Sequence, residues 1–168
     1  PPRILPVTPD SCAVAGLSSY VRDLEAIYAA GARGVLLREP SLNDREMLEL
    51  ARSAREIFHD SWLGIHDRVH VGKLVSADAV HLSFRSLRAR QVRGSLAMDV
   101  SLGLSHHLEE LNDPSMEGDY RFVSPVFPTI SKPIHGSTLG LAGLQSASLL
   151  DRTWALGGVT AAVVPEVL

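Results

Sequence analysis

The 168-residue sequence has one cysteine, few aromatic residues (5%) and no apolar run as long as 18 residues. Cys12 alone cannot form an intramolecular disulfide. The lack of a long apolar run argues against a membrane-spanning helix, and no signal-peptide pattern precedes the first predicted strand. We therefore expect a cytoplasmic protein that does not contact a membrane.

Clusters of basic residues are also missing. The formal net charge is -3, and no run of lysine or arginine exceeds two neighbours, so no nucleic-acid surface is indicated. The residues present, 45% hydrophobic and 21% charged, are typical of a globular domain. We expect a single domain over residues 1–168 with a small-molecule partner. Because the chain starts at Pro1 rather than methionine, we expect a fragment or a trimmed chain.

Short apolar runs alternate with stretches of helical period along the whole chain. The predicted strands are residues 4–7, 34–37, 63–65, 79–82, 100–103, 120–124 and 154–156. One helix carries apolar residues over 21–28 and ends at Gly31, and another, capped by Asn43 or Asp44, runs to about residue 58. Further helices are predicted over residues 69–74, 87–92, 107–111, 141–150 and 161–168.

This alternation predicts an α/β fold with a parallel sheet, either open and doubly wound or closed as a barrel. The first strand is followed by Thr8-Pro9-Asp10-Ser11 and not by a glycine-rich turn, which argues against a dinucleotide-binding sheet. We favour a TIM-barrel-like (β/α) barrel. Its eighth strand is expected to be missing, because the pattern stops after seven strands.

Polar residues gather where five of the predicted strands end, which is where barrels of this type carry their active sites. They are Arg38, Glu39, His66, Asp67, Arg68, Ser105, His106, His107, Thr129, Ser131, Lys132, Gly157, Gly158 and Thr160. The arginines and the lysine supply positive charge, and the glycines let backbone N–H groups approach a phosphate. The set indicates a pocket for an anionic substrate, although polar residues also begin wherever strands stop.

The histidines and Asp67 leave several roles open. Asp67 could bind magnesium, pair with Arg68 or cap the following helix, and His66 could transfer protons or only donate a hydrogen bond. His106 and His107 lack zinc-type spacing, but one of them could face the pocket. His135 lies in a loop, where it either faces solvent, the interpretation we favour, or belongs to a lid over the barrel mouth. His81 is expected to be packed inside a strand.

The segment FVSPVFPTISKP at residues 122–133 resembles the strand-six loop of the thiamine phosphate synthase family, which includes synthases and TenI-type thiazole tautomerases. Further landmarks follow in the family's order. They are GVLLRE at 34–39, IHDR at 65–68, DAVHL at 78–82, GLS at 103–105, LGL at 139–141 and GGVT at 157–160. On these motifs the chain is identified as a member of this family, with similarity from the first strand to the helix after the seventh.

The resemblance implies an eight-stranded barrel that binds a thiazole phosphate. In synthases it also implies hydroxymethylpyrimidine diphosphate and magnesium, with pyrophosphate leaving a carbocation-like pyrimidine centre. By this resemblance Thr129 and Ser131 bind the thiazole phosphate beside Gly158, and Lys132 binds pyrophosphate. The remaining matches are Arg38 as the strand-two arginine, Ser105 near the pyrimidine, and Asp67 as a magnesium ligand.

The chain departs from the synthase pattern on the diphosphate side. Leu36 and Pro40 stand where synthases carry glutamine and lysine, His66 replaces an asparagine, and Ser86 replaces the second magnesium aspartate. These losses favour a thiazole tautomerase, with His66 or His107 as the catalytic proton shuttle and no cofactor. The alternative is a synthase with magnesium, and the third possibility is a non-catalytic phosphate-binding member. Open strand edges predict a homo-oligomer.

Overall fold

The computed structural model describes residues 1–83, 86–106, 118–129, 138–148 and 152–168. The chain divides into two compact units, Pro1–Ser101 and Leu102–Leu168. Each unit contains parallel strands and helices, so the α/β class expected from the alternating pattern is confirmed. The single domain over residues 1–168 stays a prediction.

The first unit is built on three parallel strands, β1 (Gly34–Leu37), β2 (Trp62–His66) and β3 (Ala79–Leu82). Leu37 pairs with Ile65, and His66 pairs with His81. All residues of β1 and β3 are buried, as expected for strands that are apolar on both faces. The expected strand 4–7 is reduced to one parallel bridge from Val7 to Leu36, because Ile4 is exposed and Pro6 has no N–H to extend the pairing.

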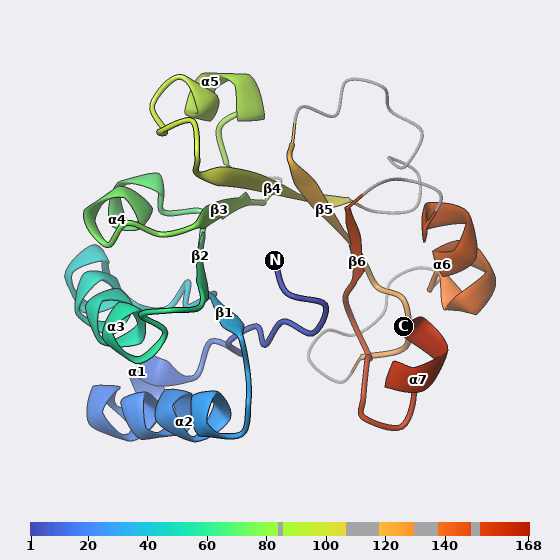
Figure 1. Ribbon diagram of the computed structural model, residues 1–168, viewed down its shortest axis with the longest axis horizontal. Coiled ribbons are helices and arrows are strands. Elements are labelled where there is room, and N and C mark those ends of the chain that lie inside the picture. Colours follow the sequence, from blue (N-terminus) through green and yellow to red (C-terminus); the bar gives the residue numbers. More distant parts are fainter. Residues whose placement is uncertain (84–85, 107–117, 130–137, 149–151) are drawn as a thin grey trace. The chain divides into compact units, whose positions relative to one another are not determined.

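Helices cover one side of these strands. Figure 1 shows α2 (Leu17–Ala29), α3 (Asp44–Ile57) and α4 (Val69–Leu74) on the same side of β1, β2 and β3. Their buried residues, among them Leu24, Met47 and Leu50, form the core together with Leu63 and Ile65. A short helix α1 (Cys12–Ala15), which was not predicted, precedes α2, and α5 (Ala89–Arg93) follows β3.

The predicted ends of the two long helices are confirmed. Gly31, at φ +101°, ends α2 in a Schellman motif. Its N–H donates to the carbonyl oxygen of Tyr28, and the N–H of Ala32 donates to the carbonyl oxygen of Ile27. Asn43, and not Asp44, caps α3, because its side chain accepts from Glu46 N–H while the Glu46 carboxylate accepts from Asn43 N–H.

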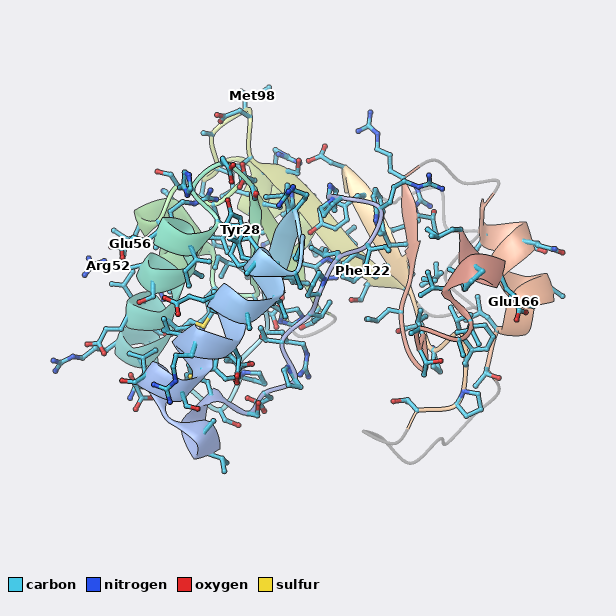
Figure 2. The ribbon with its side chains drawn as sticks, turned by 60° about the horizontal axis from the view of Figure 1, so that its bottom comes forward. Tyr28, Arg52, Glu56, Met98, Phe122 and Glu166 are labelled. Atoms are coloured by element: carbon cyan, nitrogen blue, oxygen red, sulfur yellow. The ribbon has the colours of Figure 1, made fainter. Side chains whose placement is uncertain are left out.

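The outer face of α3 is polar. Arg52 and Glu56, labelled in Figure 2, are exposed on this helix. Residues on its other face, such as Ala51 and Ala54, are fully buried. The helix is thus amphipathic in the way that its sequence period predicts.

The second unit has its own parallel strands, β4 (Ser101–His106), β5 (Tyr120–Val123) and β6 (Thr153–Ala155), with β4 beginning at the unit boundary. Phe122, seen on β5 in Figure 2, is paired with Ser105 on one side and Trp154 on the other. The helix α6 (Gly140–Ser148) contacts β6 and α7 (Val164–Val167). The expected helix 161–168 is thus shortened at its start, and the one expected at 107–111 lies outside the described residues.

Within the described parts of the chain, no helix combines the length and the apolar character needed to cross a bilayer.

Candidate active site

Three strand ends of the first unit carry the polar residues singled out in the sequence. Since β1, β2 and β3 are parallel, their carboxyl ends lie at the same edge of the sheet. Arg38 and Glu39 follow β1, His66 ends β2 with Asp67 next to it, and Ser83 follows β3. The site at this edge is therefore assembled from segments that are far apart in the sequence.

Asp67 is the centre of a hydrogen-bond network at this edge. Its Oδ1 accepts from Ser83 N–H at 2.7 Å and from the Ser86 hydroxyl. Its Oδ2 accepts from the Ser83 hydroxyl at 2.8 Å and lies 3.2 Å from Nδ1 of His66. The backbone of Asp67 adopts φ +61°, which aspartate tolerates better than most residues, and its N–H donates to His81 O.

These contacts set the ionisation of Asp67. Burial alone would raise the pKa of its carboxyl group, but the hydrogen bonds from His66, Ser86 and Ser83 outweigh burial and hold that pKa below its ordinary value. The carboxylate is therefore ionised at neutral pH. An ionised carboxylate only accepts hydrogen bonds, so a neutral His66 that bonds to it carries its proton on Nδ1 and keeps the lone pair on Nε2.

His66 is held from a second direction by His81. The two rings stack with centroids 5.7 Å apart and planes inclined by 24°. His81 is 1% exposed, which confirms the expectation of a packed histidine within a strand. The imidazole of His66 is thus fixed by one carboxylate and one ring, as a proton-transferring group needs to be.

Arg68 does not contribute its charge to this network. Its guanidinium donates to Leu42 O and forms an ion pair with Asp44 at 3.2 Å, at the start of α3. Asp67 and Arg68, considered together in the sequence as a possible pair, are bonded to other groups. Arg68 therefore fixes the loop that leads into α3.

The two residues after β1 have separate roles. Glu39 is 3% exposed and accepts hydrogen bonds from Asp10 N–H, Cys12 N–H and the Tyr20 hydroxyl, so it holds the loop after residue 8 in place. The backbone N–H of Arg38 donates to Thr8 Oγ1 at 2.7 Å. Arg38 is half-buried, and its guanidinium makes no ion pair or hydrogen bond with the described residues. Its charge is therefore not neutralised by a partner among these residues.

A cavity of about 220 Å³ lies beside Asp67. It is lined by Asp67, Val69, Leu82, Ser86, Leu87 and Val92. Pockets for drug-sized ligands occupy roughly 300–1,000 Å³, so this cavity is smaller than a typical ligand pocket.

In the second unit, Ser105 lies near the end of β4 and Thr129 lies beyond β5, and both are half-buried. Gly157 and Gly158 follow β6 with φ +90° and +67°. A Cβ on Gly158 would clash with Pro128 O, so glycine is required there by the close packing of the 125–128 loop. Whether these glycines bind a phosphate stays a prediction.

Several sequence candidates lie outside the described residues, namely His107, Ser131, Lys132 and His135. Ser83 was not among the residues predicted from the sequence, and Ser86 was expected only to replace a metal ligand. The available signal was the position of Ser83 directly after β3, at the same strand edge as Asp67.

A comparison with known protein families shows which family the chain belongs to. The family model described as thiamine monophosphate synthase matches residues 4–168. The chain belongs to this family. Its landmarks at residues 34–39, 65–68 and 122–133 led to the same family from the sequence.

The relatives of this protein include thiamine-phosphate synthases. Thiamine-phosphate synthase of Laribacter hongkongensis is 34% identical over 164 residues, which cover 94% of this chain and 76% of that protein. Thiamine-phosphate synthase of Methanococcus vannielii is 30% identical over 157 residues, covering 90% of this chain and 75% of that protein. The expectation of an enzyme is confirmed, and the relatives favour the synthase alternative over the tautomerase that the sequence analysis placed first.

A solved structure of the family confirms the fold class. Thiamine phosphate pyrophosphorylase from Pyrococcus furiosus matches with a TM-score of 0.78 at 27% identity, covering 98% of this chain and 80% of that one. The TIM-barrel-like α/β class expected from the sequence is therefore confirmed.

The magnesium that the family resemblance implies does not fit the donors around Asp67. A carboxylate has about four acceptor positions, and those of Asp67 are taken by Ser83 N–H, two serine hydroxyls and His66. The described residues contain no group of three or more histidine, cysteine, aspartate or glutamate side chains that could hold a metal ion. Asp67 as a magnesium ligand stays a prediction that this arrangement does not support.

Proposed function

We propose that this protein is a thiamine-phosphate synthase, which joins a thiazole phosphate to hydroxymethylpyrimidine diphosphate and releases pyrophosphate. The observation that carries the proposal is the 34% identity to a synthase over 94% of the chain. The family match over residues 4–168 is in agreement with it. The natural partners are then two small phosphorylated molecules.

Arg38 supports this proposal from the first unit. Loss of pyrophosphate from the pyrimidine leaves negative charge on the departing group, and a fixed cation lowers the energy of that charge. Arg38 is our candidate for this cation, because its backbone follows the end of β1, where Thr8 holds its N–H, and its guanidinium has no partner among the described residues. Arg68 is not available for this role, because its guanidinium is paired with Asp44.

The remaining roles are proposed by the family resemblance. Thr129 and Ser131 bind the thiazole phosphate, with the backbone of Gly157 and Gly158 beside it. Lys132 binds the diphosphate, and Ser105 contacts the pyrimidine. His66 lies at the same strand edge as Arg38, and its fixed ring contributes a hydrogen bond or a proton at Nε2.

Thiazole tautomerase is the second candidate, and one observation favours it. His66 is oriented by Asp67 at 3.2 Å and stacked on His81, as a proton shuttle would be, while Ser86 stands where a second carboxylate is expected. Aromatisation of a thiazole carboxylate phosphate needs a proton transfer but no departure of pyrophosphate.

A paired assay separates the two functions. Purified protein is given thiazole phosphate, hydroxymethylpyrimidine diphosphate and magnesium, and both pyrophosphate and thiamine phosphate are followed over time. A second reaction contains only the thiazole carboxylate phosphate and is followed by the absorbance of the aromatic product. Equal amounts of pyrophosphate and thiamine phosphate support the synthase, whereas turnover in the second reaction alone would replace the proposal with the tautomerase.

A further inference from the structure

We infer that Asp67 in this chain anchors the turn after β3 by hydrogen bonds and does not ligate a divalent cation. The inference goes beyond the proposed function, because it concerns how this strand edge is held together. It applies to either of the two candidate reactions.

The hydrogen bonds around Asp67 run in the wrong direction for a metal site. A metal site needs several lone pairs that point to one place, as carboxylate and carbonyl oxygens provide. Around Asp67 the neighbours are donors instead: Ser83 gives a backbone N–H and a hydroxyl, and Ser86 gives a second hydroxyl. A backbone N–H has no lone pair to offer, so a cation placed here would have to displace the turn.

The hydroxyl of Ser86 is also fully engaged in hydrogen bonds. The hydroxyl oxygen of Ser86 accepts from Ser83 N–H at 3.1 Å while its proton goes to Asp67. Both polar ends of this hydroxyl are therefore used within the turn. An aspartate at this position could not donate to Asp67, and two carboxylates at this distance would repel each other unless a cation lay between them.

The backbone at Asp67 favours the same role. Its φ of +61° is a conformation that costs energy for most residues, and it is fixed by Asp67 N–H donating to His81 O at 2.8 Å. This conformation brings the carboxylate to Ser83, which directly follows β3, and to Ser86 further along the chain. Asp67 thus links the end of β2 to the segment that follows β3.

The test measures binding of Mn²⁺ alone, as a spectroscopic stand-in for magnesium, by electron paramagnetic resonance and calorimetry. We expect wild-type protein to bind Mn²⁺ no more tightly than the variant Asp67→Asn. We expect Ser86→Asp, which restores a second carboxylate, to gain affinity by about tenfold or more. Ser86→Asn is the matched control, with a side chain of similar size and no charge, and it should gain nothing.

Thermal unfolding tests the anchor independently of any metal. Asp67→Asn keeps a side chain that tolerates positive φ, but it replaces one carboxylate oxygen by an NH₂ group. This donor would face the other hydrogen-bond donors around residue 67. We expect its melting temperature to fall by about 4 °C or more. Ser86→Ala removes one donor, so its melting temperature should fall by less than that of Asp67→Asn, and the variant should stay folded. These two variants test the anchor even if Ser86→Asp does not fold.

Two results would overturn the inference: wild-type binding of Mn²⁺ that Asp67→Asn removes, or an Asp67→Asn variant as stable as the wild type. Neither result bears on the proposed function, which fails only in the substrate assay. Conversely, a protein without synthase activity that still shows the expected Mn²⁺ and melting behaviour would leave this inference intact.

Discussion

The hydroxyl of Tyr20 on α2 donates a 2.5 Å hydrogen bond to Oε1 of Glu39, directly after β1. Both residues are almost fully buried, with exposed fractions of 5% and 3%. The bond connects a helix to the strand end that carries Arg38. Because Glu39 also holds the backbone of Asp10 and Cys12, its loss would affect the whole loop that borders the site.

Removing this hydroxyl should destabilise the protein. Tyr20→Phe leaves a buried carboxylate with one donor fewer, which is expected to cost about 1.5–3 kcal/mol in the free energy of unfolding. Urea denaturation measures this difference. Tyr28→Phe is the control, because the Tyr28 hydroxyl bonds to Asp60 at the surface and should change stability little. Equal losses in the two variants would contradict the assigned role of Glu39.

Alkaline pH should weaken the same contact. Burial, and then the hydrogen bond to Glu39, raises the pKa of Tyr20 above its ordinary value. The neutral phenol is therefore favoured by folding, and this stabilisation is fully present below about pH 10 and lost as pH rises further. We expect the free energy of unfolding to fall above about pH 10, and to fall less steeply in Tyr20→Phe. Burial also raises the pKa values of Tyr120 and Cys12, and these two groups contribute to the slope that remains in that variant.

A side chain at Gly158 should be strongly destabilising. In Gly158→Ala the new Cβ meets Pro128 O and the backbone of Phe127, and we expect a loss of more than about 3 kcal/mol. Gly140 is the matched control, since it has a similar φ of +62° and an added Cβ would meet nothing within 4 Å. Gly140→Ala should cost only about 1–2 kcal/mol. Chemical denaturation of both variants checks the prediction, and similar losses would assign the effect to backbone strain alone.

Substitution of Arg38 should impair catalysis without unfolding the protein. Arg38→Gln removes a charge-assisted contact of about 1.5–3 kcal/mol, which corresponds to a loss of roughly 10- to 100-fold in kcat/KM for the diphosphate substrate. The control is Arg52→Gln, which removes the same charge on the exposed face of α3 (Figure 2). Unchanged kinetics in Arg38→Gln would exclude Arg38 from the diphosphate site.

Much of the secondary structure could be read from local patterns. The strands Gly34–Leu37 and Ala79–Leu82 and the helix Val69–Leu74 have the bounds that the sequence predicts. Their signals are local: a short apolar run for a strand, and a helical period with a cap such as Asn43 for a helix. The short helix at residues 12–15 was missed, because four residues are too few to show a period.

The family and the polar residues at its strand ends were therefore determined by the sequence alone, since motifs and periods are properties of neighbouring residues. Only the tertiary structure decided which groups those residues meet. Asp67 accepts hydrogen bonds from Ser83 and Ser86, and Glu39 from Tyr20, across separations of 16 to 19 residues. Arg68 binds Asp44 instead of its neighbour Asp67. The direction of a polar side chain depends on partners that folding brings close, and no local pattern specifies them.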